Sequence, residues 1–320
     1  MKSADIRIMS AEKALKYKLL GMMEARPGMF GRLDTDYSNA LYVKKTNPQR
    51  VQIIANGGGG YGPLYSGFIG PGLADATCEG NFDTAPNAYA LYELAKILGS
   101  EQGVLFIANN FAGDFLNNDM ALELLRGEGI EAMVLYANDD IMSAQGEPRE
   151  MRGGLHGTAT LVKIAACAAE ALLPLNEVYR IAGKANDNQR SISVQLNPAT
   201  RKIEFGTGFS GEPPVHVIAY ENVEQLAELT LTFLIKELAP DKNKKIYITL
   251  NKMNEMSYTE AYGLLHLLRK NINKDFEVGG SVCGAYFDAY EGNGFMLSLL
   301  SADDELQKYI RYVSGYDFAI

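Results

Sequence analysis

The chain has 320 residues, of which 47% are hydrophobic and 22% charged, and its formal net charge at pH 7 is -9. This length favours two domains over a single core. The negative charge, without a dense basic run, disfavours direct nucleic-acid binding, and no apolar stretch is long enough to cross a membrane.

The cysteines and the N-terminus both predict a cytoplasmic protein. Cys78, Cys167 and Cys283 are far apart, odd in number and without metal-ligand spacing, which is typical of reduced thiols. No long apolar segment follows residues 1–7, so we expect no secretory signal. No pair of histidines has ligand spacing either, so no metal centre is predicted.

In the first part of the chain, short apolar runs alternate with helical patterns. This alternation is typical of βαβ units around a parallel sheet. Pro86 can occupy the first turn of the first predicted helix. We predict strands at 51–55, 104–108 and 133–137, and helices at 86–98, 117–127 and 158–173.

A polar stretch, 183–188, interrupts this pattern and marks a domain boundary. We predict an N-terminal α/β domain over 1–182, which contains the glycine-rich ligand loop, and a C-terminal α/β domain over 183–320. The predicted fold class is therefore α/β, with two domains that each consist of a sheet flanked by helices. In the second domain we predict strands at 191–196, 245–250 and 295–300, and helices at 223–238 and 257–270.

Four consecutive glycines, 57–60, follow the first predicted strand. Ordering them costs backbone entropy, so the chain must turn tightly there or a ligand must contact bare peptide. Gly57, Gly59 and Gly62 match the G-x-G-x-x-G pattern, but no helix opens at the loop, which disfavours a dinucleotide site. No Lys-Ser or Lys-Thr follows, which excludes a P-loop. We predict a small-molecule site, with a tight crossover lacking a ligand as the alternative.

Asp114 follows the second predicted strand in the run Asn109–Asp114. Loops at the carboxyl ends of parallel strands converge on one crevice, where ligands bind. There Asp114 can accept a hydroxyl proton or a hydrogen bond from a polyol. The alternative is a helix N-cap for 117–127, which the local sequence favours equally.

Other polar residues have weaker local signals. Ser210 lies in the glycine-rich turn 206–214 but lacks the Gly-x-Ser-x-Gly context of a hydrolase nucleophile. His156 is the only histidine in a loop that can serve a site. His216 is interpreted as structural, and His266 as a structural or half-exposed helix residue. The pair Asp139-Asp140 is interpreted as solvated caps or surface charge.

Several blocks run in one order over most of the chain: 57–63, 66–70, 78–80, 84–86, 103–105, 110–114, 152–154, 204–208, 211–213, 260–263, 284–286 and 294–295. Together they resemble the substrate-binding subunit of dihydroxyacetone kinase. The resemblance implies two α/β domains of that type, a homodimer, a role in glycerol metabolism and a site for a three-carbon ketose. It also implies phosphorylation with help from a separate ATP-carrying subunit or domain. We therefore expect this chain to bind no cofactor itself, and to meet ATP or ADP only through a partner.

Four residues of this chain differ from the family site that the resemblance implies. Ser210 stands where the family holds its ketone as a hemiaminal on a histidine, and a hydroxyl is a poorer partner for such an adduct. Tyr61 replaces a second histidine, and a phenol with a pKa near ~10 is a poor base at neutral pH. Asn109 replaces a lysine and Ala85 a substrate-contacting serine. The carboxylate, Asp114, stands as expected.

These residues define the predicted site. Asp114 and Tyr61 are its catalytic candidates. The substrate-binding candidates are Gly58, Gly59, Tyr61, Ala85, Asn109, Asp114 and Ser210.

Three functional hypotheses remain open. The first is a sensor or coactivator that binds a small ketose or polyol and engages a transcription regulator. The second is an active phosphotransferase that uses Asp114 with Tyr61 or His156 and needs an ATP-binding subunit. The third is an unrelated enzyme that recruited Tyr61, Asp114 and Ser210.

Overall fold

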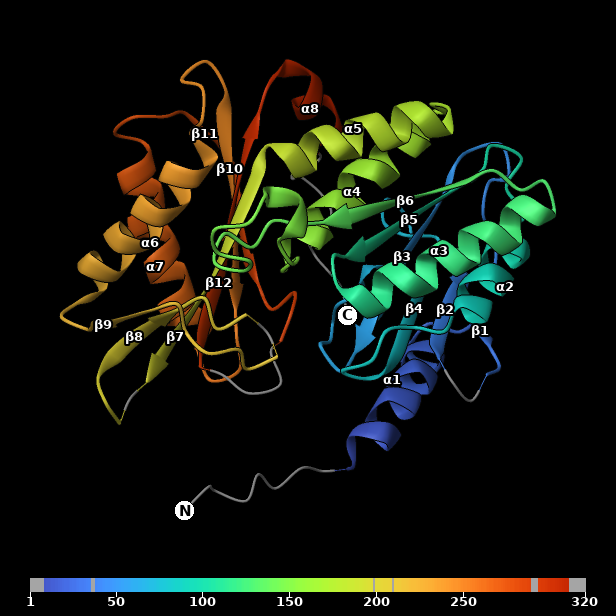
Figure 1. Cartoon of the computed structure of the whole chain (residues 1–320), viewed down its shortest axis with the longest axis horizontal. Helices are drawn as coiled ribbons and strands as arrows, with labels where there is room; N and C mark the ends of the chain where they lie inside the picture. Colours follow the sequence, from blue (N-terminus) through green and yellow to red (C-terminus); the bar gives the residue numbers. More distant parts are fainter. Residues whose placement is uncertain (1–8, 36–37, 198, 209, 289–292, 311–320) are drawn as a thin grey trace.

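The computed structural model describes residues 9–35, 38–197, 199–208, 210–288 and 293–310. Residues 1–7, on which the expectation about a secretory signal rests, lie outside this part, as does Phe209 in the third glycine-rich turn. Two six-stranded sheets lie side by side, each flanked by helices (Figure 1). The predicted α/β fold class is confirmed.

The first sheet has the strand order β1-β2-β4-β3-β5-β6, and β3 to β6 form its parallel part. Its strands are β1 Phe30–Leu33, β2 Asn39–Val43, β3 Gln52–Gly59, β4 Ala76–Phe82, β5 Val104–Asn109 and β6 Ala132–Ala137. Its helices are α1 Ala11–Ala25, α2 Ala88–Leu98, α3 Ala112–Gly127, α4 Gly157–Glu170 and α5 Leu175–Asp187, with short 3-10 turns at Ser66–Phe68 and Arg149–Met151.

Helices cover both faces of this parallel sheet, so its central strands are apolar on both sides. Ile54 and Phe106 pack with α2 and α3 on one face. Ile53 and Leu105, one residue earlier in each strand, pack with α4 and α5 on the other. The alternation explains why 104–108 forms a continuous apolar run.

The second sheet has the order β11-β10-β12-β7-β8-β9 and is antiparallel except between β10 and β11. Its strands are β7 Gln189–Asn197, β8 Lys202–Phe205, β9 His216–Ala219, β10 Lys245–Lys252, β11 Val278–Gly284 and β12 Gly294–Ala302. The remaining helices are α6 Val223–Leu238, α7 Tyr258–Ile272 and α8 Asp304–Tyr309.

Helix α4 packs between the two sheets. Residues 157–169 of this helix are all buried, which is typical of a helix surrounded by protein. On one side α4 packs on β3 and β5, and on the other its core cluster includes Met296 and Leu300 of β12. The helix predicted at 158–173 therefore lies between the two sheets.

The predicted domain boundary between residues 182 and 183 falls inside the continuous helix α5. The second sheet starts just after that helix, at Gln189. The core that contains α4 also draws residues from both sheets. The division into domains 1–182 and 183–320 stays a prediction.

The interpretation of Asp139 and Asp140 as surface charge is wrong. Both are buried, with exposed fractions of 0% and 5%. Asp139 accepts hydrogen bonds from the backbone N–H groups of Leu155 and Gly157, and Asp140 from that of Met142. Burial raises the pKa of both carboxyls, that of Asp140 to about 7. They anchor the turn between β6 and α4, a long-range role that the local sequence does not reveal.

Among the described helices, none combines the length and apolar character that a membrane crossing requires.

Candidate functional site

A cavity of about 200 Å³ lies at the carboxyl ends of the parallel strands. Gly58 is the last residue but one of β3, Ala85 follows β4, Asn109 ends β5 and Asp114 lies in the first turn of α3. A loop between β8 and β9 supplies Ser210 from the second half of the chain. The lining residues are Gly58, Tyr61, Tyr65, Asp83, Thr84, Ala85, Asn109, Phe111, Gly113, Asp114, Ser210 and Phe287.

Of the predicted site residues, only Gly59 does not line this cavity. A Cβ at Gly59 would lie 2.2 Å from the carbonyl oxygen of Gly80, so its glycine permits close contact between β3 and β4. A Cβ at Gly57 would lie 2.1 Å from the Tyr65 hydroxyl oxygen. These two glycines make room for neighbouring chain, and Gly58 provides bare backbone at the cavity.

Three hydroxyl and carboxyl groups close one side of the cavity. The Tyr61 hydroxyl donates a hydrogen bond to Asp83 and lies 3.1 Å from Ser210 Oγ. Ser210 Oγ also donates to Asp83 Oδ1, at 3.3 Å. The contacts join loops that are far apart in the sequence, because Asp83 follows β4 and Ser210 lies beyond β8. We call Tyr61, Asp83 and Ser210 the hydroxyl bridge.

The hydroxyl bridge leaves Tyr61 a poor base. Its ring is buried and stacks on Phe287, with ring centroids 5.5 Å apart. Burial, and then the bond to Asp83, raise the pKa of Tyr61 well above its ordinary value. The phenol therefore keeps its proton at neutral pH, as the sequence analysis expects.

Tyr61→Phe is expected to lower the free energy of unfolding by about 1–2 kcal/mol. The variant retains the ring stacking but removes the hydroxyl that bridges Asp83 and Ser210, and hydrogen bonds of this kind contribute about that much. Urea unfolding at pH 7 measures the difference. Tyr262→Phe, at an exposed position of α7, is the control. Equal stability of the two variants would show that the hydroxyl bridge contributes nothing.

Asp114 is the cavity's unsatisfied acceptor. Its exposed fraction is 4%, and its Oδ1 has no hydrogen-bond partner within the described part of the chain. Burial raises the pKa of this carboxyl to about 7. The helix N-cap is Phe111, so the expected alternative role of Asp114 as the cap is wrong. A buried acceptor without a partner is costly unless a ligand satisfies it.

Asn109 and Tyr65 form a fixed part of the cavity wall. The Asn109 side-chain oxygen accepts a hydrogen bond from the Thr158 hydroxyl of α4. The buried carboxylate of Glu79 accepts the backbone N–H groups of Tyr65 and Ser66, at 3.1 and 2.8 Å. Lys18 of α1 in turn pairs with Glu79 at 2.6 Å. These bonds position the loop that carries Tyr61 and Tyr65.

His156 does not belong to the site. It is fully buried between the sheets, and its Nε2 lies 3.2 Å from the Thr249 carbonyl oxygen and 3.1 Å from Ser298 Oγ. It does not line the cavity. Burial lowers the pKa of His156 to about 4, so the imidazole is neutral at physiological pH. The expectation that it can serve a site from a loop is wrong, because that loop is covered by the second sheet.

His156 is expected to destabilise the fold in acid. A histidine whose folded pKa is about 4 and whose unfolded pKa is about 6.5 contributes its full stability above pH 6.5 and loses it as the pH falls toward 4. At pH 5 this loss is about 2 kcal/mol. His156→Gln should therefore lose less stability than the native chain between pH 7 and pH 5, as measured by urea unfolding. His266→Gln, on an exposed face of α7, is the control and should lose as much stability as the native chain over this pH range. If both variants lose less stability than the native chain, the acid sensitivity does not come from His156.

Asp83 and Phe287 also belong to the site, although neither was among the residues predicted for it. Asp83 adopts a positive φ of 51° in the turn after β4. Its position after a parallel strand was a usable signal, similar to that of Asp114. Phe287 reaches the cavity because Pro63 bridges to it and Asp288 N–H bonds to the Gly62 carbonyl oxygen, at 3.2 Å. No local pattern could have revealed that contact.

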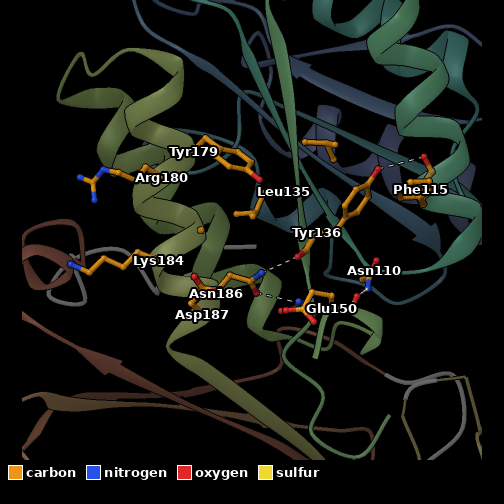
Figure 2. A pocket seen from close by; sticks show the side chains of 13 residues that line it. Asn110, Phe115, Leu135, Tyr136, Glu150, Tyr179, Arg180, Lys184, Asn186 and Asp187 are labelled. Carbon is orange, nitrogen blue, oxygen red and sulfur yellow. Dashed lines mark hydrogen bonds between the residues drawn. The ribbon is translucent and has the colours of Figure 1, made fainter. Parts of the chain in front are cut away.

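A larger hollow of about 700 Å³ lies beside β6 and α5 and is separate from the predicted residues. Figure 2 shows Asn186 reaching across it to Tyr136, whose carbonyl oxygen accepts a 2.9 Å hydrogen bond. Arg180 and Lys184 extend from α5 on the side away from Tyr136, and both pair with Glu305 of α8. The two cations of the larger hollow are therefore already paired with a carboxylate. The smaller cavity, in contrast, contains Asp114, whose Oδ1 has no hydrogen-bond partner among the described residues.

The Dak1 domain profile matches residues 20–315. The chain belongs to the Dak1 domain family. The match includes every strand that the structure describes, so the resemblance to dihydroxyacetone kinase subunits is confirmed across both sheets.

Relatives of two lengths share this Dak1 domain. The dihydroxyacetone-binding subunit of PTS-dependent dihydroxyacetone kinase 2 from Listeria innocua is 28% identical over 309 residues, which cover 92% of this chain and 93% of the relative. D-erythrulose kinase of Mycolicibacterium smegmatis is 30% identical over 284 residues, 83% of this chain but 48% of the enzyme. The chain therefore spans about half the length of that kinase.

Solved structures show the same Dak1 fold. The dihydroxyacetone kinase of C. freundii, in complex with AMP-PNP and Mg²⁺, has a TM-score of 0.84 and 25% identity, covering 95% of this chain and 59% of the enzyme. A dihydroxyacetone kinase operon co-activator has a TM-score of 0.84 and 23% identity, covering 92% of this chain and 94% of the co-activator. The second likeness concerns the fold alone.

Proposed function

We propose that this Dak1 family protein binds a small ketose or polyol without forming a covalent bond to it. The carrying observation is the hydroxyl bridge: Ser210 and Tyr61 stand where the resemblance implies histidines, and both donate to Asp83. Among the described residues, the twelve that line the cavity include no histidine. Without a nitrogen nucleophile, a carbonyl has no partner for a stable adduct.

The size and chemistry of the cavity favour a short, hydroxyl-rich ligand. About 200 Å³ limits the ligand to a few carbon atoms, since sites for drug-sized molecules are about 300–1,000 Å³. The Asp114 carboxyl provides an acceptor for a ligand hydroxyl. Phe111 and Phe287 provide apolar wall for its carbon skeleton.

We infer a sensor or coactivator role from this loss of covalent capture. One protein of similar fold is itself a dihydroxyacetone kinase operon co-activator. By the same logic, the partner of this chain is a transcription regulator, and the chain acts as a cytoplasmic homodimer. No cofactor is assigned to the chain itself.

A phosphotransferase is the second candidate, and Asp114 favours it. A carboxyl with a pKa of about 7 can act as a general base at neutral pH, because the best catalytic pKa lies near the working pH. A hydroxyl of the bound ketose would give its proton to Asp114 and attack the γ-phosphate. The ATP, and the ADP that remains, would be held by a separate partner subunit.

Binding and turnover measurements separate the two candidates. Dihydroxyacetone, D- and L-erythrulose and glycerol are titrated into the chain by calorimetry, and intact mass spectrometry under denaturing conditions reports any covalent addition. The same ligands are then incubated with the chain, ATP and a family ATP-binding subunit. We expect binding with neither covalent mass nor phosphorylated product. Product at ordinary turnover would favour the phosphotransferase, and absence of binding would refute both.

A further inference from the structure

A second hollow, of about 420 Å³, lies on the other side of the loop that carries Tyr61. Helix α1 forms one wall, and residues 62–67 form the other (α1 is the blue helix in Figure 1). Its walls are mostly apolar. Lys18, Gly21, Met22, Ala25, Arg26, Phe30, Gly62, Pro63, Ser66 and Gly67 line it, and we call it the α1 groove.

The polar side chains of the α1 groove are all hydrogen-bond donors or cations. Ser66 has an exposed fraction of 1%, and its Oγ has no hydrogen-bond partner among the described residues. The Lys18 ammonium pairs with Glu79, and the half-buried Arg26 makes no ion pair within the part of the chain described. Among the described residues, no acidic residue lines the groove. Because Lys18 is already paired, Ser66 and Arg26 are the groups that remain, and a ligand that satisfies both carries a hydrogen-bond acceptor and a negative charge.

Gly21 leaves the apolar part of the groove open. It lies inside α1, where glycine destabilises a helix by about 0.5–1 kcal/mol relative to alanine. A Cβ at Gly21 would meet no atom within 4 Å. Packing therefore does not require glycine at this position, and the missing side chain leaves open space beside a residue that lines the groove.

From these observations we propose that the α1 groove binds an apolar monocarboxylate, with its carboxylate near Ser66 and Arg26 and its chain along Met22, Phe30 and Pro63. The volume of about 420 Å³ lies within the range of known small-molecule sites. Carboxylate bonds to a guanidinium are stronger than neutral hydrogen bonds. The site is independent of the ketose cavity, so its failure would leave the proposed function untouched.

The test is calorimetric titration of the full chain with decanoate below its micelle concentration. We expect saturable binding of decanoate, and binding at least about tenfold weaker for decanol, which has the same chain without the charge. Decyltrimethylammonium, which reverses the charge, should not bind. Equal binding of decanoate and decanol, or no binding of decanoate, would overturn the proposal.

Variants locate the binding. Gly21→Leu should fill the groove and abolish decanoate binding, while leucine favours the helix and protects folding. Gly263→Leu is the matched control, because Gly263 also lies inside a helix and a Cβ there meets no atom within 4 Å. Arg26→Gln and Ser66→Ala should each weaken binding about tenfold. Circular dichroism and thermal unfolding confirm that each variant is folded. Unchanged affinity in Gly21→Leu would refute the α1 groove as the site.

Discussion

Asp114→Asn is expected to weaken ketose or polyol binding by roughly 10–100-fold while making the unliganded protein more stable at pH 8. The loss of affinity follows because a hydrogen bond to a charged group contributes about 1.5–3 kcal/mol. The substitution keeps the shape of the side chain but removes the carboxyl group, whose Oδ1 has no hydrogen-bond partner among the described residues. Calorimetric titration with dihydroxyacetone at pH 8 measures the first effect.

The gain in stability follows from the raised pKa of Asp114. The folded carboxyl has a pKa of about 7, against 3.8 for an ordinary Asp. Between these values the unfolded chain is ionised while the folded chain retains the proton, so stability falls as the pH rises. The penalty is complete above pH 7 and absent below about pH 4. Its size is on the order of 2–4 kcal/mol, and urea unfolding of Asp114→Asn at pH 8 should recover it.

The control for this prediction is Asp119→Asn, an exposed position on the same helix. It removes the same charge from α3 without touching the cavity, so neither affinity nor stability should change appreciably. If Asp114→Asn unfolds with a higher free energy and binds ligand more weakly, and Asp119→Asn does neither, Asp114 serves ligand binding at a cost in stability. Unchanged affinity would remove Asp114 from the ligand site.

Ser210→His is expected to make the cavity bind a ketose more tightly than the corresponding polyol, whereas the native cavity should bind both with similar affinity. In the native chain the Ser210 hydroxyl bonds to Asp83, and dihydroxyacetone and glycerol should bind with similar affinity. An imidazole at this position supplies a nitrogen nucleophile that can add to the ketone carbon. As the C–N bond forms, the π bond of the carbonyl breaks and its oxygen takes up a proton from water to become a hydroxyl. The imidazole returns its own N–H proton to water, so the adduct is neutral.

The ratio of dihydroxyacetone to glycerol affinity is the measurement. We expect this ratio to rise about tenfold or more in Ser210→His, because a net gain of about 1.4 kcal/mol in binding free energy already has that effect. Intact mass spectrometry under denaturing conditions should show the added mass of one ketose in Ser210→His and none in the native chain. Ser210→Asn, which is polar but not nucleophilic, is the control. A similar preference in both variants would show that size or polarity, and not the imidazole, determines it.

The sequence predicted a large share of the fold because its central elements are long and strongly patterned. The helix at 223–238 begins and ends as predicted, and the runs 104–108 and 295–300 are central buried strands. Errors concentrate at the ends of elements. Helix α3 starts at Ala112 instead of residue 117, and β3 continues to Gly59 instead of ending at residue 55. Glycines are compatible with a strand when a neighbouring backbone approaches closely, and Gly80 does so here.

The sequence by itself determined the family, the α/β class and the residue types of the site, because ordered blocks and hydrophobic periodicity are local properties of the chain. Tertiary structure alone decided which polar residues share a cavity. His156 and Asp139 looked like loop residues, yet the second sheet and the turn before α4 bury them. Asp83 and Ser210 meet across 127 positions of sequence. Burial and pairing depend on which distant segments fold together, and a local pattern does not record those contacts.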